Sequence, residues 1–388
     1  MPKLVRGENV SRIRVISIFG TRPEAIKMAP LVKELEKRNE IESIVCVTAQ
    51  HREMLDQVLN IFNIVPDFDL DIMQARQTIT DVTARVLYGL TEVFQTAKPD
   101  IVLVHGDTTT TFAGSLAAFY NKLMIGHVEA GLRTYNKYEP FPEEMNRVLT
   151  SSLADLHFAP TDRARVNLLE EGIPKEKIYV TGNTVIDALR YTLSDSYVFD
   201  DETLREIDFS NKRVVTLTAH RRENLGEPMR EICEAVLSIV EQHENVEVVY
   251  PIHKNPAVRE TVYAILGSHP RIHLIEPLEL ADMHNLLNRS YLVMTDSGGL
   301  QEEVPSMGKP VLVLRNVTER PEGIEAGTLK LAGTEKERIV ELANELLTSE
   351  EAYEKMAPAV NPFGDGYASQ RIVEAIVSVF KGNHGIYQ

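Results

Sequence analysis

The sequence predicts an α/β protein made of two doubly wound domains that face a cleft. Short apolar runs rich in Val and Ile recur along the 388-residue chain, and most of them do not alternate with polar residues. Such runs are typical of strands that are buried on both faces of a sheet. Stretches with helical periodicity lie between the runs, and strands that alternate with helices form parallel sheets with helices on both faces.

The predicted strands fall into two groups, about six before residue 182 and about five after residue 213. The first group comprises 14–19, 44–48, 101–105, 124–129, 156–160 and 178–181. The second group comprises 214–218, 246–252, 272–275, 291–295 and 310–314. Helical patterns between the strands include 28–38, 79–97, 112–121 and 229–242.

The two groups of strands predict one domain at 1–190 and a second at 191–366. The charged and weakly periodic segment 194–212 is interpreted as a linker region between them. A last helical stretch, 369–380, follows a break that contains Gly and Pro, and its periodicity is compatible with packing on either domain.

Composition argues against several classes of protein. Lys plus Arg number 41 and Asp plus Glu number 57, and the formal charge of -16 disfavours a general nucleic-acid or anionic-membrane surface. No apolar run reaches the roughly 18 residues of a membrane-spanning helix, and residues 1–12 do not resemble a secretory signal. Cys46 and Cys233 form neither a CxxC pair nor a disulfide framework, which favours the reducing cytoplasm.

The residues that directly follow each strand are the first candidates for a site, because open parallel sheets bind ligands beyond the carboxyl ends of their strands. After the first strand, Gly20 and Pro23 are ordinary for a turn into a helix. Arg22 and Lys27 are not, because the helix dipole disfavours cations in the first turns unless an anion is bound there. The sequence contains neither GxGxxG nor GxxxxGK[ST], so no NAD or P-loop ATP site is predicted.

Three acidic side chains also occupy candidate positions. Asp107 follows a strand, where it could instead cap the next helix. Glu129 ends the following strand before a Gly turn, which capping does not explain. Glu143 opens a helix after Pro142, and its alternative is a surface ion pair with Arg147, four residues later. Acids in a cleft are suited to proton transfer at hydroxyl groups or at a C–H bond.

The second half of the chain offers cations and a Gly-rich turn. His220, Arg221 and Arg222 follow the strand at 214–218, and Arg320 follows the strand at 310–314. After the strand at 291–295, small residues would let a ligand approach the backbone N–H groups, and the alternative is a simple turn with a Ser cap: Ser297, Gly298 and Gly299. Cations and such a cradle suit a diphosphate. The histidines lack HExxH spacing, so no metal site is predicted.

Together these turns resemble the non-hydrolysing UDP-N-acetylglucosamine 2-epimerases. The resemblance covers nearly the whole chain in family order: GTRPEAIK (20–27), TAQHREML (48–55), HGDTTT (105–110), HVEAGLRT (127–134), PFPEEMNR (140–147), GN (182–183), HRREN (220–224), DSGGLQEE (296–303) and TERPEG (318–323). It implies the GT-B glycosyltransferase fold, with two Rossmann-like domains and the nucleotide in the cleft. It further implies a C-terminal helix, at 367–382, that crosses back to the first domain, and a homodimer without a cofactor or metal.

The implied reaction is the reversible conversion of UDP-GlcNAc to UDP-ManNAc by inversion at C2, a step in cell-surface polysaccharide biosynthesis. The C2–H is not next to a carbonyl, so the reaction needs either transient oxidation by NAD or elimination of UDP to a 2-acetamidoglucal, followed by re-addition. The missing dinucleotide motif and the family resemblance favour elimination, which requires a base, a stabilised leaving group and exclusion of water. The alternatives are a GT-B glycosyltransferase, a hydrolysing epimerase and a nucleotide-sugar sensor without catalysis.

By motif matching, the acid/base set comprises Asp107, Glu129 and Glu143. Asp107 or Glu143 would transfer the proton at C2, and Glu129 would orient the sugar or share protons. His220, with Arg22 and Lys27, would hold the diphosphate or help it leave. Ser297, Gly298 and Gly299 would cradle phosphate oxygens. Glu303 would accept hydrogen bonds from the ribose hydroxyls, Arg320 would contact the sugar or phosphate, and Met283 would pack on the uracil.

The resemblance also implies a second, regulatory site for UDP-GlcNAc, which bacterial members can carry beside the catalytic site. The matching positions are Gln50, Arg76, Glu143, Arg221 and His253. The family often has Gln three residues after Gln50, where this chain has Glu53. A carboxylate there would repel the phosphates of an activator if it faced them.

Overall fold

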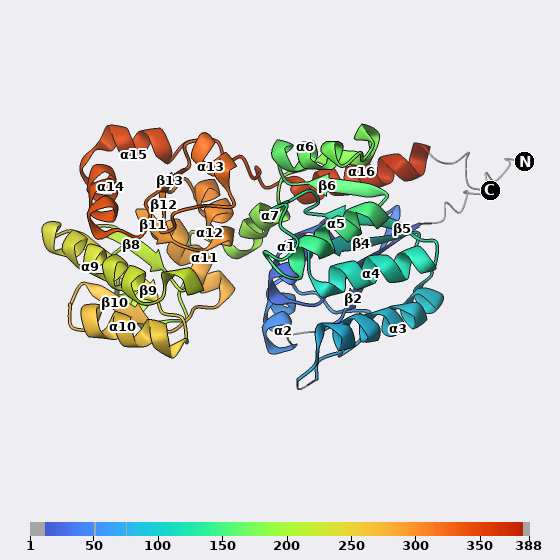
Figure 1. Cartoon of the computed structure of the whole chain (residues 1–388), viewed down its shortest axis with the longest axis horizontal. Coiled ribbons are helices and arrows are strands. Elements are labelled where there is room, and N and C mark those ends of the chain that lie inside the picture. Colours follow the sequence, from blue (N-terminus) through green and yellow to red (C-terminus); the bar gives the residue numbers. More distant parts are fainter. Residues whose placement is uncertain (1–11, 50–51, 75, 383–388) are drawn as a thin grey trace, which may run out of the picture. The chain divides into compact units, whose positions relative to one another are not determined.

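The computed structural model describes residues 12–49, 52–74 and 76–382, and the chain forms two compact units (Figure 1). Unit 1 comprises Met1–Tyr191 and Gly366–Gln388, and unit 2 comprises Thr192–Asp365. Each unit contains one parallel sheet with helices on both faces, so the two Rossmann-like, doubly wound domains that the sequence predicts are confirmed. None of the helices in the described ranges is both long enough and apolar enough to cross a membrane.

The sheet of unit 1 has seven strands in the order β3-β2-β1-β4-β5-β6-β7. Their bounds are β1 (Ile13–Phe19), β2 (Ile41–Val47), β3 (Phe68–Asp69), β4 (Ile101–His105), β5 (Met124–Val128), β6 (Leu156–Ala159) and β7 (Ile178–Val180). The direction of the strand order reverses between β1 and β4, which pair in parallel. Ligands of doubly wound sheets bind at such a reversal, beyond the carboxyl ends of the strands.

Two layers of helices cover this sheet. One layer contains α3 (Ile79–Ala97), α4 (Thr109–Tyr120) and α5 (Glu143–Leu153), and the other contains α2 (Arg52–Ile61), α1 (Arg22–Glu36) and α16 (Ala368–Gly382). The unit also contains α6 (Asp162–Glu170), η1 (Lys175–Lys177) and α7 (Thr184–Thr192). Local sequence signals explain where several helices begin. Thr21 and Thr78 form capping boxes with the acid three residues later, and Thr108 caps α4.

The sheet of unit 2 repeats the arrangement with six strands in the order β10-β9-β8-β11-β12-β13. The strands are β8 (Arg213–Thr218), β9 (Val246–Pro251), β10 (Ile272–Ile275), β11 (Leu292–Thr295), β12 (Val311–Val313) and β13 (Leu329–Leu331). The helices are α8 (Glu202–Glu206), η2 (Arg222–Asn224), α9 (Glu227–Gln242), α10 (Pro256–Leu266), α11 (Leu280–Arg289), α12 (Gly298–Glu303), η3 (Val304–Met307), α13 (Pro321–Glu325), α14 (Lys336–Thr348) and α15 (Glu350–Met356). Here the order reverses between β8 and β11.

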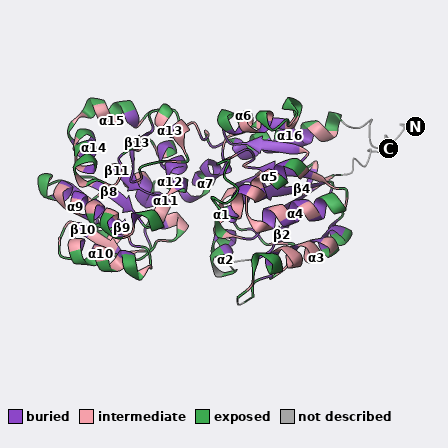
Figure 2. Cartoon of the chain, in the orientation of Figure 1, coloured by how far each residue is buried: buried purple, intermediate pink, exposed green. Residues whose placement is uncertain are grey.

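Most residues of the strands are buried in each unit (Figure 2). All five residues of β4 are buried, and the first four of them are completely inaccessible. The continuous Val and Ile runs of the sequence therefore correspond to strands that are covered on both faces. Because these strands are buried within the sheet, the sheet fixes the position at which the chain leaves each strand, and it thereby positions the residues just beyond the carboxyl ends.

The structure corrects two predictions about the elements. The short strands β3 and β13 were not predicted, because each combines a length of two or three residues with a charged residue, Asp69 or Lys330, and so forms no continuous apolar run. The segment 194–212 is not a linker. It contains α8, and its Phe199, Leu204 and Ile207 pack with Val214 in a core cluster of unit 2. Its apolar residues are spaced irregularly, so neither a strand nor a helix pattern revealed them.

Candidate active site

A buried carboxylate, that of Glu24, joins the two turns at the reversal of strand order in unit 1. Its Oε2 accepts hydrogen bonds from the backbone N–H groups of Gly20 (3.1 Å) and Thr21 (2.8 Å) and from the Thr21 hydroxyl (2.7 Å). Its Oε1 accepts from the hydroxyl of Thr108 (2.7 Å), which follows β4. Burial raises the pKa of Glu24, and these hydrogen bonds act against that rise. Sequence analysis did not identify Glu24, although the capping-box spacing marks one of its two roles.

Asp107 leaves β4 through Gly106, whose φ of +67° favours glycine. Arg147 of α5 donates to Oδ2 of Asp107 from Nε (2.9 Å) and Nη2 (2.6 Å), and Asn146 Nδ2 donates to its carbonyl (2.9 Å). Among the described residues, Oδ1 of Asp107 accepts no hydrogen bond, and the side chain is 25% exposed. The alternative role as helix cap is wrong, because the cap of α4 is Thr108. Asp107 is thus a carboxylate that is held by one oxygen and accessible at the other.

Glu143 is the first residue of α5 and is partly exposed. The alternative ion pair with Arg147 does not form. Arg147 contacts Asp107 and, through Nη1, Oε2 of Glu144 (2.9 Å). The other oxygen of Glu144 accepts from the backbone N–H groups of Thr134 (3.0 Å) and Tyr135 (2.9 Å). Glu144 therefore fixes the start of α5, and the Glu143 carboxylate makes no ion pair with any described residue.

Glu129 follows β5 with a φ of +63°, a left-handed conformation that costs a residue with a Cβ about 1–2 kcal/mol. Its side chain is only 8% exposed, and its Oε2 contacts the ammonium of Lys27 and accepts from Nδ2 of Asn183 (2.7 Å). Oε1 lies 3.5 Å from the point where a Cβ on Gly106 would stand, which places Glu129 beside the turn that carries Asp107. Asn183 belongs to the GN motif, and its contact with Glu129 was not predicted.

Two buried histidines support this part of the sheet edge. Burial lowers the pKa of His105 to about 4 and that of His127 to about 3, so both rings are neutral near pH 7. Nε2 of His127 donates to the Gly106 carbonyl (2.7 Å), and Nε2 of His105 lies 3.8 Å from Oε2 of Glu129. Arg22, the first residue of α1, is exposed and makes no ion pair with the part of the chain that the structure describes.

In unit 2, a second buried carboxylate joins the turns at the reversal of strand order. Asp296 follows β11 and is completely buried. Its Oδ2 accepts from the backbone N–H groups of His220 (2.8 Å) and Arg221 (2.8 Å), which follow β8, and from Nδ2 of Asn224 (3.0 Å). The two units thus use the same device, a carboxylate across the switch point, to position the residues after their central strands.

Two guanidinium groups approach the start of α12. A Cβ on Gly298 would stand 3.5 Å from a guanidinium nitrogen of Arg221, 3.9 Å from one of Arg320 and 3.9 Å from a carboxylate oxygen of Glu319. Ser297 occupies the N-cap position, but its side chain makes no capping hydrogen bond, so the Ser-cap alternative is wrong. Arg320 also pairs with Glu302. The first N–H groups of a helix lack intrahelical partners, and with two cations beside them they suit an anionic ligand.

The other matched residues of unit 2 lie around these turns. The ring of His220 is 40% exposed and stacks on His253 at a centroid distance of 5.1 Å. The carboxylate of Glu303 accepts from Nε2 of His284 (3.1 Å). Met283 is partly buried and packs against the core cluster below α12. Because 40% of its side chain is exposed, His220 is accessible to a ligand.

The residues matched to a regulatory site are only partly covered by the structure. Gln50 and the side chain of Glu53 lie outside what the structure describes. Arg76 is exposed and has a φ of +60°. Arg221 and His253 both lie next to His220, one along the chain and one by ring stacking. Within unit 2, two of the proposed regulatory residues are therefore neighbours of a proposed catalytic one.

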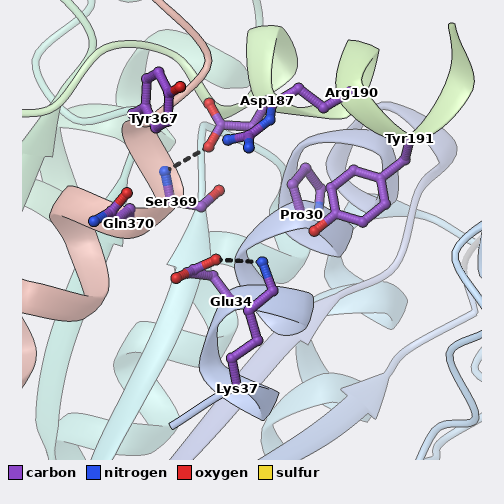
Figure 3. Close-up of a pocket in the computed structure, with 9 residues that line it drawn as sticks. All are labelled: Pro30, Glu34, Lys37, Asp187, Arg190, Tyr191, Tyr367, Ser369 and Gln370. Atoms are coloured by element: carbon purple, nitrogen blue, oxygen red, sulfur yellow. Dashed lines mark hydrogen bonds and ion pairs between the residues drawn. The ribbon is translucent and has the colours of Figure 1, made fainter.

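A cavity of about 250 Å³ in unit 1 is lined by none of the predicted site residues (Figure 3). It lies between α1, α7 and α16. Asp187 accepts from the N–H groups of Ala368 (3.1 Å) and Ser369 (2.7 Å) at the start of α16. Arg190 donates to the Gly366 carbonyl (3.0 Å). These polar groups hold α16 on unit 1, and we interpret the cavity as part of that structural contact.

The two sheet edges differ in their chemistry. Unit 1 presents two accessible carboxylates, Asp107 and Glu143, which are suited to proton transfer. Unit 2 presents His220 and two guanidinium groups beside the start of a helix, which are suited to phosphate. Across residues 12–49, 52–74 and 76–382, no group of three or more His, Cys, Asp or Glu side chains is arranged to hold a metal ion.

Comparisons with known proteins extend over both units. Residues 33–377 match the family model of UDP-N-acetylglucosamine 2-epimerase. The chain is 59% identical over 368 residues to the UDP-N-acetylglucosamine 2-epimerase of Bacillus subtilis (strain 168), covering 95% of this chain and 96% of that protein. The structure is similar to UDP-GlcNAc 2-epimerase from Neisseria meningitidis bound to UDP-GlcNAc (51% identity, TM-score 0.84, 94% of this chain and 100% of that chain). It is also similar to the Methanocaldococcus jannaschii UDP-GlcNAc 2-epimerase in complex with UDP-GlcNAc and UDP (34% identity, TM-score 0.74, 94% and 100%).

Proposed function

This chain belongs to the UDP-N-acetylglucosamine 2-epimerase family, and on that premise we propose that it converts UDP-GlcNAc to UDP-ManNAc reversibly, by elimination and re-addition of UDP. The observation that carries the proposal is the state of Asp107. Arg147 holds one oxygen of this carboxylate in place, and the other oxygen accepts no hydrogen bond from the described residues. A carboxylate that is fixed in position but available to substrate is what proton transfer at C2 requires.

In the proposed first step, a base removes the proton from C2. The electron pair of the C2–H bond forms the C1–C2 double bond, and the bond between C1 and the phosphate oxygen breaks. The products are a 2-acetamidoglucal and UDP. In the second step, the phosphate oxygen attacks C1 again, and C2 receives a proton on the opposite face. The net change is inversion at C2, without oxidation or reduction.

The residues of unit 1 divide between two roles in this proposal. Asp107 and Glu143 transfer the protons, since both carboxylates are accessible. Asp107 pairs with one cation, Arg147, and Glu143 makes no ion pair with any described residue. Glu129 orients the sugar, because its Oε2 is already occupied by Lys27 and Asn183. The buried contact of Lys27 with Glu129 makes Lys27 a support for that carboxylate, and Arg22 remains the candidate for the diphosphate.

Unit 2 supplies the stabilisation of the leaving group. Arg221, Arg320 and the first N–H groups of α12 would bind the diphosphate, whose negative charge increases as the bond to C1 breaks. Glu303 would accept the ribose hydroxyls, and Met283 would lie against the uracil. His220 would contact the phosphate oxygen that leaves C1.

Incubation of the purified chain with UDP-GlcNAc in heavy water tests the proposal. We expect UDP-ManNAc without any added acceptor and deuterium at C2 of the sugar. Asp107→Asn and Glu143→Gln should each lower kcat by about 10²-fold or more with a much smaller change in KM. Glu170→Gln, at an exposed position on α6, is the matched control and should have normal activity.

Three outcomes would contradict the proposal. Free ManNAc as the main product would indicate a hydrolysing epimerase, and a requirement for an acceptor would indicate a glycosyltransferase. Turnover without deuterium at C2 would exclude the elimination route. If Asp107→Asn and Glu143→Gln changed kcat and KM equally, the assignment of these acids to proton transfer would be wrong.

A further inference from the structure

Asp296 has one oxygen that its structural role does not use. Three donors on Oδ2 complete the connection between the turns after β8 and β11. The other oxygen, Oδ1, is buried and accepts no hydrogen bond from the described residues. A buried carboxylate oxygen without a donor is costly, and such oxygens are rare in folded proteins.

The comparison with Glu24 in unit 1 makes this oxygen informative. Glu24 has the same role between two turns, but both of its oxygens accept hydrogen bonds. At Asp296, an asparagine could provide one carbonyl oxygen for the same three donors. A carboxylate is needed only if the second oxygen also accepts a hydrogen bond in some state of the protein.

The nearest ionisable nitrogen is on His220. Its Nδ1 lies 3.7 Å from Oδ1 of Asp296, slightly beyond hydrogen-bond distance. A small rotation of the imidazole ring would close this gap. The ring is 40% exposed, and Nε2 is on the opposite edge from Nδ1, so the same rotation keeps Nε2 directed away from the buried carboxylate.

We propose that Asp296 is a positioning residue for His220, whose Nδ1–H it binds through Oδ1 so that Nε2 faces the leaving phosphate. This inference rests on the proposed function, because it assumes that His220 contacts the diphosphate. When the bond between C1 and oxygen breaks, the electron pair stays on the phosphate oxygen, and the imidazolium gives that oxygen the proton from Nε2. In the re-addition step the proton returns to Nε2.

The groups around His220 explain why a carboxylate is required there. Burial, the stacked His253 and the neighbouring Arg221 all lower the pKa of His220, and Asp296 is the group that raises it. Without the negative charge of Asp296, the ring would lose its proton at lower pH. The carboxylate therefore sets both the orientation of the ring and the pH range in which it is an acid.

NMR of the full-length chain labelled with ¹⁵N-histidine tests this inference directly. His220→Gln identifies the His220 signals. In the parent protein we expect the neutral ring to carry its proton on Nδ1. In Asp296→Asn we expect the pKa of His220 to fall by at least one pH unit, and the alkaline limb of the kcat profile to move to lower pH by the same amount.

Asn224→Ala is the matched control, since it removes a donor to Oδ2 and leaves the charge of Asp296 in place. The pKa of His220 should change little in this variant. A parent ring with its proton on Nε2 would overturn the inference without any variant, so it remains testable even if Asp296→Asn does not fold. A pKa of His220 that is unchanged in a folded Asp296→Asn would also overturn it.

The spectra separate this inference from the proposed function, because they need neither substrate nor turnover. If the Nδ1 tautomer and the pKa shift are found but His220→Gln keeps full activity, the contact with Asp296 stands and the catalytic role of His220 fails. If the pKa does not depend on Asp296 but His220→Gln is inactive, the catalytic role stands and the positioning role of Asp296 fails.

Discussion

Replacing His157 by Gln should make unit 1 more resistant to mild acid. His157 on β6 pairs in register with His127 on β5, and both side chains are completely buried. Burial lowers the pKa of His157 to about 4 and that of His127 to about 3, from an ordinary value of 6.5. On β4, burial likewise lowers the pKa of His105 to about 4. All three rings therefore stay neutral in the folded protein at pH 5, whereas the same histidines are protonated in the unfolded chain at that pH.

The sign of the effect follows from proton binding. As the pH falls below about 6.5, each histidine gains a proton in the unfolded chain but not in the folded one, so the free energy of unfolding decreases. The loss continues until the folded pKa is reached, near 3 to 4. At pH 5 it amounts to about 2 kcal/mol for each histidine, and at pH 7.5 it is below about 0.1 kcal/mol. Three such residues together would remove about 6 kcal/mol, much of the stability of an ordinary domain.

Native-state hydrogen exchange of peptides from β4, β5 and β6 measures this free energy locally, so the presence of a second unit does not complicate it. The difference in opening free energy between His157→Gln and the parent should shift by about 2 kcal/mol in favour of the variant between pH 7.5 and 5.0. His269→Gln, in unit 2, serves as the control and should leave these peptides unchanged. A difference that is constant over this pH range would refute the reasoning, whatever its size at pH 7.5.

Two further substitutions test the local geometry of unit 1. Asp187→Ala removes the acceptor for the N–H groups at the start of α16, and hydrogen exchange of that helix should show a loss of about 1–2 kcal/mol; unchanged protection would contradict the capping role. Gly131→Ala combines a φ of +91° with a Cβ 2.3 Å from the carbonyl oxygen of Ala164, so its melting temperature should fall far more than that of Gly172→Ala, which has a φ of +82° and no atom within 4 Å. Equal decreases in the two variants would show that the clash has no effect.

The strands and the first candidates for the site were predictable because both depend on local sequence. A run such as 101–105 is apolar in its first four residues, and β4 has those bounds. The rule that ligands bind after parallel strands then selected Asp107 and Glu129 without knowledge of their neighbours. The packing of the segment 194–212 was not predicted, because its apolar residues contact residues elsewhere in unit 2. A pattern within one segment carries no information about such contacts.

The residues that hold the site in place were harder to predict for the same reason. Glu24, Arg147 and Asn183 each act through a contact with a residue that is distant in sequence: Thr108, Asp107 and Glu129, respectively. Their residue types are common in turns and helices, where capping and surface ion pairs explain them equally well. Only the tertiary arrangement distinguishes these roles, as where the pairing of β1 with β4 brings Glu24 to Thr108.

The attachment of α16 to unit 1 has a consequence for how the protein is made. Unit 2 is one uninterrupted stretch of chain, whereas unit 1 is completed only by residues after position 365. On the ribosome, all of unit 2 has therefore been synthesised before the helix that packs against α1 exists. Unit 2 is therefore the first unit whose residues have all been synthesised. Asp187 and Arg190 lack their partners at Gly366, Ala368 and Ser369 until that later part of the chain has been made.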